Sequence, residues 1–303
     1  MAHNKNITSG GDTACYILEL QKISKSFGLV KANKDIDLQI EVGTIHGIIG
    51  ENGAGKSTLM NILYGLQRSD SGEMFIDGTI VKIKSSADAL ALGIGMVHQH
   101  FMLINRFSVL ENVMLGSEGG SLLNAGKIAT INKLKELGQT FDMEVDPHAL
   151  VSDLNVGMRQ RVEILKALKS GAKILILDEP TGVLTPQEAT QLFGILDKLR
   201  TNGVTVLLIT HKLAEIMAIT DSVSIMRGGE MVGHRKTSDT NPQELAELMV
   251  GRKVLLNVEK PEAKPKEVAL NVNSLGCFSS RGHKVLDDLT FHVKAGEILG
   301  IAG

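Results

Sequence analysis

Alternating apolar and polar residues mark two strands near the start of the chain and a third stretch further on. Residues 16–20 and 36–40 alternate in this way, which is the pattern of half-buried strands. The alternation returns at 74–76 and 80–83, where a short turn divides it. These segments predict an antiparallel β portion in the N-terminal part of the chain.

Uninterrupted apolar runs predict a second kind of strand. Residues 44–50, 174–177 and 204–209 form such runs, and continuous apolar strands are typical of parallel sheets that are covered on both faces. A helical pattern over 187–200 lies between the last two runs and completes a βαβ unit. Another helix is expected over 56–63. The sequence therefore predicts an α/β fold with a parallel core.

The middle of the chain favours helix. Residues 85–170 are mostly helix-forming, with breaks at the glycines near 116–120 and at Pro147. We therefore expect a helical subdomain, inserted in the core at about residues 100–167.

Composition and an internal repeat divide the chain into parts. Residues 1–14 are polar and predict a flexible tail, and a first domain follows at 15–253. Residues 254–267 are charged and contain proline, as interdomain linkers do.

Residues 268–303 then repeat the start of the first domain. Several positions of 284–303 match 31–50 at one constant offset, which predicts a duplicated domain. Because Gly303 matches Gly50, we expect the chain to be truncated within the second copy.

Charge and hydropathy narrow the functional classes. The formal net charge is −2 and acids and bases are interspersed, so no basic surface for nucleic acid is expected. No run of about 18 apolar residues occurs, which is the length that a membrane-spanning helix needs. A role at a membrane would therefore require a membrane partner.

A phosphate-binding loop is expected between the strand at 44–50 and the helix that follows. Residues 50–57, Gly-Glu-Asn-Gly-Ala-Gly-Lys-Ser, fit the pattern GxxxxGK[ST]. Such a loop turns successive backbone N–H groups toward phosphate oxygens, and the helix N-terminus adds partial positive charge. Lys56 is expected to reach the β- and γ-phosphates and Ser57 to bind Mg²⁺.

Polar side chains follow three of the short apolar segments. Asp178 and Glu179 come directly after the run 174–177; one carboxylate can hold Mg²⁺ and the other can act as a general base on water. His211 follows the run that ends at 209, at the strand end where α/β folds bind ligands. Gln99 can bind Mg²⁺ or position water through its amide oxygen. A surface turn for the acids and a structural role for His211 are the alternatives.

The order of these motifs resembles that of the ATP-binding-cassette (ABC) ATPases. Between Gln99 and Asp178, residues 154–163 (LNVGMRQRVE) match the family signature LSGGQ and the helix that follows it. The resemblance covers roughly residues 16–250 and, as a repeat, 268–303. It implies a P-loop NTPase cassette fold, ATP and Mg²⁺ as cofactors, and ATP hydrolysis.

The resemblance also implies specific contacts. Phe27 falls where the family places the aromatic ring that stacks on adenine, with a core phenylalanine as the alternative. Asn155 and Gly157 would reach the nucleotide of an opposing cassette. The expected catalytic residues are Lys56, Gln99, Glu179 and His211; the expected nucleotide-binding residues are Phe27, Gly50, Glu51, Asn52, Gly53, Ala54, Gly55, Lys56, Ser57, Thr58, Asn155 and Gly157; the expected metal-binding residues are Ser57, Gln99 and Asp178.

Three residues depart from the family pattern. Asn155 stands where the signature usually has serine, Arg159 where glutamine is usual, and Thr185 where many cassettes have aspartate. The first two changes bear on the signature side of the site. The ATP-binding side, from Lys56 to His211, follows the pattern.

Tandem cassettes with a Val-Gly-Met signature resemble the ATPase subunits of sugar and nucleoside importers. Residues 95–103 and 179–188 look most like the nucleoside branch. Such a subunit would work at the cytoplasmic face of the membrane, with two permeases and a substrate-binding lipoprotein or periplasmic protein. It would pair with a second cassette, from the missing C-terminal half or from a homodimer, and bind no nucleic acid. Two alternatives stay open: a soluble tandem ATPase not linked to transport, and a catalytically weak truncated cassette.

Overall fold

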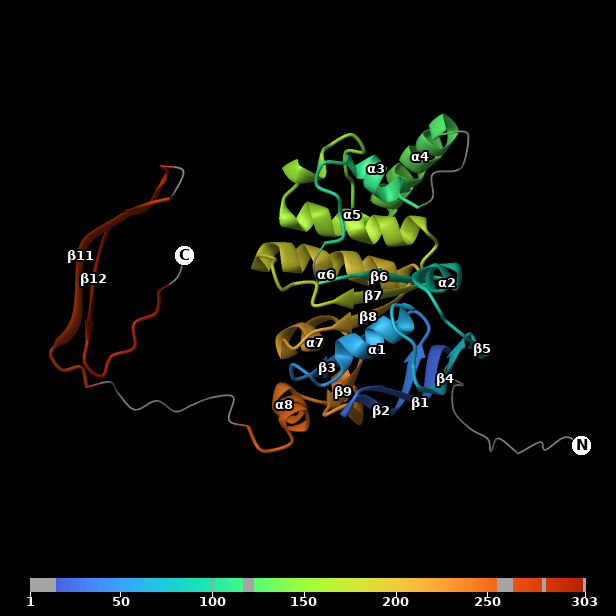
Figure 1. The fold of residues 1–303 in the computed structure, drawn as a ribbon, viewed down its shortest axis with the longest axis horizontal. Helices are drawn as coiled ribbons and strands as arrows, with labels where there is room; N and C mark the ends of the chain where they lie inside the picture. The colour runs from blue at the N-terminus through green and yellow to red at the C-terminus, as the bar shows by residue number, and fades with distance from the viewer. Residues whose placement is uncertain (1–14, 100, 117–122, 255–263, 280–281, 302–303) are drawn as a thin grey trace, which may run out of the picture. The chain divides into compact units, whose positions relative to one another are not determined.

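The computed structural model describes residues 15–99, 101–116, 123–254, 264–279 and 282–301. It separates into two compact units, residues 1–254 and 255–303, and each is described by itself (Figure 1). The tail at 1–14 and most of the linker at 254–267 lie outside the described residues.

The antiparallel β portion of unit 1 is confirmed. Its strands run in the order β2–β1–β4–β5 and are β1 (Tyr16–Phe27), β2 (Val30–Glu41), β4 (Ser71–Ile76) and β5 (Thr79–Val81). The first two strands are longer than predicted because they continue as a ribbon with irregular register beyond the alternating segment. The prediction therefore found the buried half of the hairpin and missed its exposed tip.

The parallel core is also confirmed. Within the described residues it is a six-stranded sheet in the order β10–β9–β3–β8–β7–β6, in which only β10 runs antiparallel to its neighbour. Its strands are β3 (Ile45–Gly50), β6 (Ile94–Val97), β7 (Ile174–Asp178), β8 (Thr205–Ile209), β9 (Ser222–Arg227) and β10 (Glu230–Lys236).

One segment that we expected to be mostly helical contains a strand. β6 pairs in parallel with β7 along its whole length, and all four of its residues are buried. A four-residue apolar segment has no periodicity that separates a strand from a helix. Pairing with β7, which is distant in sequence, decides its conformation.

The helices of unit 1 cover both faces of the parallel sheet. They are α1 (Lys56–Leu63), α2 (Ser86–Ala91), α3 (Val109–Met114), α4 (Leu123–Phe141), α5 (Val156–Lys169), α6 (Pro186–Thr201), α7 (Leu213–Ile219) and α8 (Pro242–Val250), with short 3-10 turns η1 (Val151–Asp153) and η2 (Thr237–Asp239). The expected helices at 56–63 and 187–200 are both present. Among the described helices, none is long and apolar enough to cross a bilayer.

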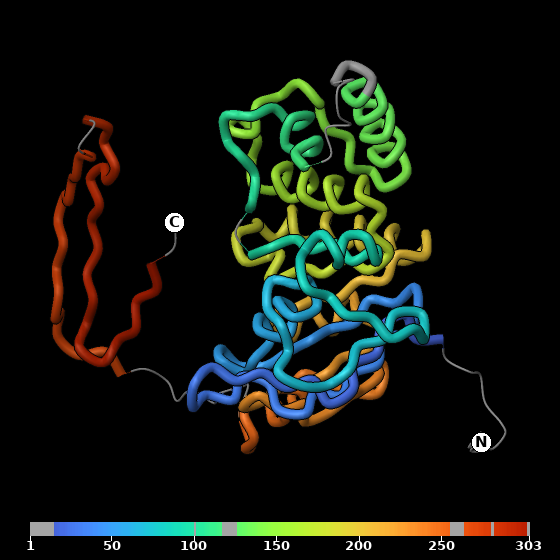
Figure 2. Tube along the Cα trace, turned by 45° about the vertical axis from the view of Figure 1, so that its right-hand side comes forward, coloured from blue at the N-terminus to red at the C-terminus, as the bar shows by residue number. Residues whose placement is uncertain are grey.

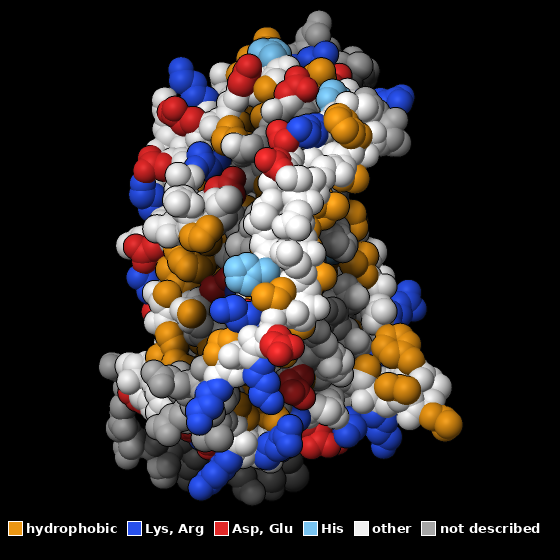
Figure 3. All heavy atoms as spheres, turned by 90° about the vertical axis from the view of Figure 1, so that its left-hand side faces the viewer, with side chains coloured by type: hydrophobic (Ala, Val, Ile, Leu, Met, Phe, Trp, Pro, Cys, Tyr) orange, Lys and Arg blue, Asp and Glu red, His pale blue; other side chains and the backbone are white. Residues whose placement is uncertain are grey.

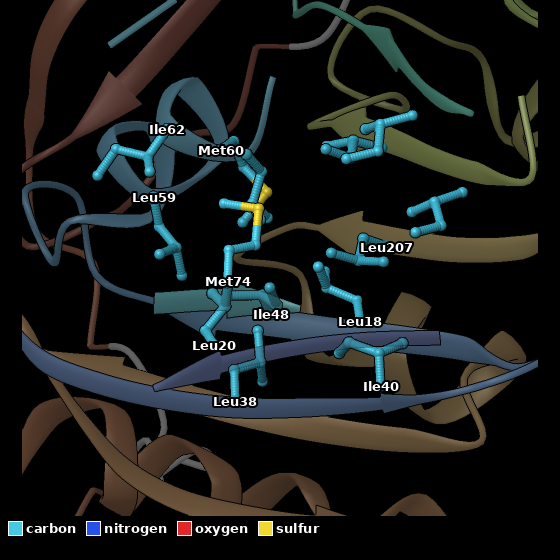
Figure 4. Close-up of a cluster of buried hydrophobic side chains, with 14 of the residues drawn as sticks. Leu18, Leu20, Leu38, Ile40, Ile48, Leu59, Met60, Ile62, Met74 and Leu207 are labelled. Atoms are coloured by element: carbon cyan, nitrogen blue, oxygen red, sulfur yellow. The ribbon is translucent and has the colours of Figure 1, made fainter. Parts of the chain in front are cut away.

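Helix α1 is packed between the two sheets. Its apolar side chains share one core with both sheets, and Figure 4 shows them meeting there. Leu59 and Met60 of α1 belong to one buried cluster with Leu18 and Leu38 of the antiparallel sheet and Ile48 of β3. All but Leu38 are fully buried, and Leu38 is nearly so. This packing fixes the start of α1, and with it the phosphate-loop segment, against the end of β3.

A second core lies on the other face of the parallel sheet. Leu175 and Leu177 of β7 belong to it, whereas Ile174 and Ile176 belong to the first core. Alternate residues of one continuous apolar run therefore face opposite cores, as the sequence predicted. Helices α3, α4 and α5 gather at the end of unit 1 away from the antiparallel strands (Figures 1 and 2). They fall in the range expected for the helical subdomain, although α5 also shares the sheet core.

Unit 2 is described as a hairpin of β11 (Val268–Phe278) and β12 (Lys284–Lys294). Its pairing repeats that of β1 and β2: Val272 faces Phe291 as Leu20 faces Leu38, with the register shifts at corresponding places. The irregularities repeat as well. The Lys22 N–H donates to Asp37 Oδ1 at 2.9 Å, and the Ser274 N–H donates to Thr290 Oγ1 at 2.9 Å. The two segments that the sequence repeat relates thus share one hairpin geometry.

Charged side chains of both signs occur on the face shown in Figure 3. This distribution agrees with the small net charge of the whole chain, −2.

A buried histidine of β3, His46, connects this strand to β9 and β10. His46 is 1% exposed, and its Nε2 and Nδ1 lie 2.9 and 2.8 Å from the hydroxyls of Ser224 and Ser222. Its ring stacks on that of His234, with centroids 5.4 Å apart. Burial lowers the pKa of His46 to about 3, and His234 acts in the same direction. The folded protein therefore holds a neutral His46.

This pKa predicts how stability depends on pH. Above about pH 6.5 both states keep His46 neutral, so it has no effect there; below that value only the unfolded chain gains the proton, and stability falls toward pH 3. Between about pH 7.5 and pH 5 the loss should be about 2 kcal/mol. The amide of His46→Gln does not titrate. Between these two pH values its free energy of unfolding, measured with urea, should therefore fall by about 2 kcal/mol less than that of the wild type. Equal losses in the two proteins would show that His46 is not the group responsible.

Candidate functional site

The phosphate-loop segment connects the end of β3 to the start of α1. Two of its glycines allow close backbone contacts: a Cβ at Gly50 would lie 2.4 Å from the Met226 carbonyl oxygen, and one at Gly55 2.2 Å from that of Ala32. Gly55 also has φ +101°, in the left-handed region. The first turn of α1 contains no acidic side chain, so the partial positive charge of the helix start is not offset there.

Lys56 lies inside the loop. It is buried, and its Nζ donates to the carbonyl oxygens of Gly50 at 2.7 Å and Glu51 at 3.0 Å. Burial lowers the pKa of Lys56, while the nearby carboxylates of Glu179 and Asp178 raise it. The loop residues Glu51, Asn52, Gly53 and Ser57 are exposed, Thr58 is half-buried and Ala54 is buried. A buried ammonium beside exposed loop residues can pair with an incoming phosphate.

Glu179 lies between Gln99 and His211. Its Oε1 is 2.9 Å from His211 Nδ1, and its Oε2 accepts a hydrogen bond from Gln99 Nε2 at 3.3 Å. Gln99 follows β6, Glu179 follows β7 and His211 follows β8. The carboxyl ends of these three strands share one edge of the sheet. The structure thus brings together three side chains that are separated by 80 and 32 positions in sequence. A carboxylate held in this way can accept a proton from water.

Asp178 ends β7, directly before Glu179. Burial raises the pKa of its carboxyl and Glu179 raises it further, against the opposing effect of Lys56. A bound divalent cation would offset the repulsion between these two carboxylates. The donor set fits Mg²⁺: Ser57 supplies a hydroxyl, Asp178 a carboxylate and Gln99 an amide oxygen, because the nitrogen of that amide bonds Glu179.

Three other candidate residues lie on β1 and at the start of α5. Phe27, at the end of β1, is 46% exposed, and the Lys25 ammonium lies 5.6 Å from its ring centroid. Its ring is therefore accessible for stacking. Asn155 is the N-cap of α5, with Oδ1 accepting from the Met158 N–H at 2.8 Å. Among the described residues, no hydrogen bond links Asn155 or Gly157 with the phosphate-loop segment.

The residues that depart from the family pattern have structural partners. Arg159 donates to the Leu154 carbonyl at 3.0 Å and the Ser152 carbonyl at 3.1 Å, in the segment just before α5. Thr185 caps α6 in a capping box with Glu188. The spacing Thr-x-x-Glu before a helix is the signal that predicts such a cap. Arg159 therefore stabilises the backbone just before α5, and Thr185 stabilises the start of α6.

Asn33 and Gln160, which sequence reasoning did not single out, support the site. The buried Asn33 donates from Nδ2 to the Gly55 carbonyl at 3.1 Å, and Gln160 donates from Nε2 to the Pro180 carbonyl at 2.9 Å. Asn33 could have been noticed in the sequence as an amide side chain just before the alternating stretch at 36–40. No sequence signal identifies the partner of Gln160, because the contact joins α5 to the turn after β7.

The ABC transporter family model matches residues 33–182. The match contains the phosphate-loop segment, Gln99, the signature residues and Asp178-Glu179. The chain carries an ATP-binding cassette of the ABC transporter family. Its fold agrees with that of solved cassettes.

The cassette is similar in sequence to import ATP-binding proteins. It is 46% identical over 287 residues to the nucleoside import ATP-binding protein NupA of Lactococcus lactis, a match that covers 95% of this chain and 57% of NupA. It is 45% identical to the guanosine import ATP-binding protein NupO of Bacillus subtilis, covering 95% and 56%. The chain thus spans little more than half the length of these relatives.

Solved structures resemble the cassette along most of their own length. A nucleotide-free ATP-binding cassette from an ABC transporter matches with a TM-score of 0.68 at 25% identity, covering 77% of this chain and 98% of that one. A dimeric bacterial ABC transporter cassette matches with a TM-score of 0.60 at 27% identity, covering 73% and 98%.

Lys56 should be required for nucleotide binding. Lys56→Ala removes charge-assisted hydrogen bonds to phosphate worth roughly 1.5 to 3 kcal/mol each, so the affinity for ATP should fall by about a hundredfold or more. Lys34→Ala is the matched control, since Lys34 is an exposed lysine of β2 that pairs with Glu230 at 3.1 Å. Calorimetric titration with ATP measures both variants. Equal affinities would remove Lys56 from the site.

Proposed function

We propose that this chain is the ATP-binding and ATP-hydrolysing subunit of an ABC importer, which couples hydrolysis to uptake of a nucleoside or a simple sugar. The observation that carries the proposal is the Glu179 carboxylate, held between Gln99 and His211 at the sheet edge where the phosphate-loop segment begins. Membership of the cassette family supports the same activity.

Each residue of the site has a role in this proposal. The backbone of residues 50–57 and the Lys56 ammonium hold the β- and γ-phosphates, with Phe27 stacked on the adenine. Ser57, Asp178 and Gln99 would hold Mg²⁺, which when bound would neutralise phosphate charge. Glu179 takes a proton from the attacking water, and His211 donates a hydrogen bond to the γ-phosphate.

The names of the relatives support the nucleoside branch. NupA and NupO are named for import of nucleosides and guanosine, while a glucose import ATP-binding protein of Haloferax volcanii, TsgD13, is 44% identical. We propose a nucleoside as the first choice and a simple sugar as the second. The partners would be two membrane permeases and a substrate-binding lipoprotein or periplasmic protein, with the cassette at the cytoplasmic face.

A second cassette completes the proposal. The shared register and irregularities of the β1–β2 and β11–β12 hairpins support reading residues 268–303 as the start of another cassette. Asn155 and Gly157 would then serve a nucleotide on the opposing cassette. The Asn155 side-chain oxygen caps α5, and among the described residues no hydrogen bond engages its amide nitrogen, which could make this contact.

Glu179 should act on water and not on nucleotide binding. Glu179→Gln keeps the size of the side chain and removes the base, so ATP should still bind while turnover falls by about a hundredfold or more. Glu230→Gln changes an exposed glutamate that pairs with Lys34 and serves as the control. ATP binding and phosphate release in the complete transporter give the two readouts. Near wild-type turnover of Glu179→Gln would assign the base elsewhere.

ATP hydrolysis should depend on a second cassette. Because the γ-phosphate needs donors from both cassettes in a closed, water-excluding interface, the rate per molecule should rise with protein concentration or when a second cassette is supplied. Phosphate release over a dilution series measures this, with and without the added cassette. A full rate that is independent of both would contradict the pairing.

A further inference from the structure

Helix α7 begins with a buried carboxylate that the proposed mechanism does not use. Glu215 lies in the first turn of α7 and is 8% exposed. The mechanism assigns neither a phosphate nor a metal to it. A buried carboxylate requires hydrogen-bond or ionic partners, and the partners of Glu215 lead to the hydrolytic residues.

Glu215 accepts hydrogen bonds from two buried threonines. Thr181 Oγ1 donates to Oε1, and Thr210 Oγ1 donates to Oε2 at 3.1 Å. The two threonines are 3% and 2% exposed, so water does not replace these bonds at little cost. Each carboxylate oxygen is thus bound to a different loop.

The two loops carry the proposed base and its histidine partner. Thr181 lies two residues after Glu179 in the turn that follows β7, and Thr210 directly precedes His211 after β8. Glu215 therefore links the two loops at positions one or two residues from Glu179 and His211, which contact each other at 2.9 Å.

Lys212 closes this network. Its Nζ lies 3.2 Å from Glu215 Oε1 and donates to the carbonyl and hydroxyl oxygens of Thr181 at 3.1 Å. The ammonium compensates the buried negative charge. It also adds a second connection between the loop after β7 and the loop after β8.

The backbone of Glu179 needs such support. Its φ is +46°, in the left-handed region that non-glycine residues seldom adopt. Such a conformation persists only where the surroundings fix it. The Gln160 side chain holds the Pro180 carbonyl at 2.9 Å, and Glu215 and Lys212 hold Thr181. The turn is thus tied at both residues after Glu179.

We propose that Glu215 is a positioning residue for hydrolysis: through Thr181 and Thr210 it holds Glu179 and His211 in contact. The inference rests on the proposed ATPase function. We call Glu215 with Thr181 and Thr210 the clamp, and it fixes the positions of Glu179 and His211 relative to each other. Nucleotide binding does not need the clamp, because the phosphate-loop segment and Lys56 belong to β3 and α1. Loss of the clamp therefore affects turnover more than affinity.

The test removes each threonine hydroxyl without changing side-chain size. Thr181→Val and Thr210→Val break one arm each, whereas Thr181→Ser and Thr210→Ser keep the hydroxyl. Thr220→Val is the matched control: Thr220 is a buried threonine at the opposite end of α7, bonded to Thr237 at 2.8 Å. All five variants are assayed for kcat and KM for ATP in the complete transporter.

The valine variants at 181 and 210 should lower kcat by roughly tenfold to a hundredfold, since displacement of a catalytic group by about 1 Å has effects of that size. Their KM should change by less than about threefold, and both serine variants and Thr220→Val should stay within about threefold of wild type in kcat. If Thr181→Val and Thr210→Val had the same kcat as Thr220→Val, the proposed role of Glu215 would be wrong.

A second readout does not depend on turnover. In the purified full chain labelled with nitrogen-15 at histidine, the Nδ1 resonance of His211, assigned with His211→Gln, should show the hydrogen bond to Glu179. Thr181→Val and Thr210→Val should lose that signature and Thr220→Val should keep it. If the wild type does not hydrolyse ATP, the proposed function fails while these spectra still decide the clamp. Unchanged spectra in both valine variants would refute it.

Discussion

Burial of the parallel strands on both faces is the constraint on which the site depends. β3 and β8 are buried along their whole length, and β7 up to its last residue. Such strands have no solvated face on which polar side chains can gather, so polar chemistry is confined to their ends. At the carboxyl ends lie Gly50 and the segment after it, Asp178-Glu179 and His211. The two hydrophobic cores thus place the functional residues side by side.

Electrostatics then separates the roles of neighbouring groups. Burial and Glu179 raise the pKa of Asp178, while Lys56 opposes them, so Asp178 is the carboxylate that gains most from a cation. Glu179 instead has two side-chain partners, Gln99 and His211. Adjacent acids therefore differ in surroundings, one suited to metal binding and the other to proton transfer. The backbone of Glu179 also differs from a strand, because its φ of +46° lies in the left-handed region.

Much of this arrangement is predictable from sequence, because local patterns determine it. The run at 174–177 and the helix at 56–63 were found with the bounds that the structure gives within a residue. β6 was not found, since four apolar residues become a strand only through pairing with β7. The motifs also singled out Lys56, Gln99, Glu179 and His211, and the structure brings the last three into contact. Asn33, Gln160 and Glu215 escaped, because each acts through a partner that only the folded chain brings near.

The central claim is that the segment 50–57 grips the terminal phosphates of a nucleotide. Equilibrium titration of the purified chain with ATP and with AMP, in the presence of Mg²⁺, tests this claim most directly. The two ligands share adenine and ribose and differ in the β- and γ-phosphates, which Lys56 and the loop backbone are proposed to bind. The account predicts that ATP binds at least about a hundredfold more tightly than AMP, as expected for the loss of several charge-assisted hydrogen bonds. Equal affinity for the two nucleotides, or no binding of ATP, would contradict it.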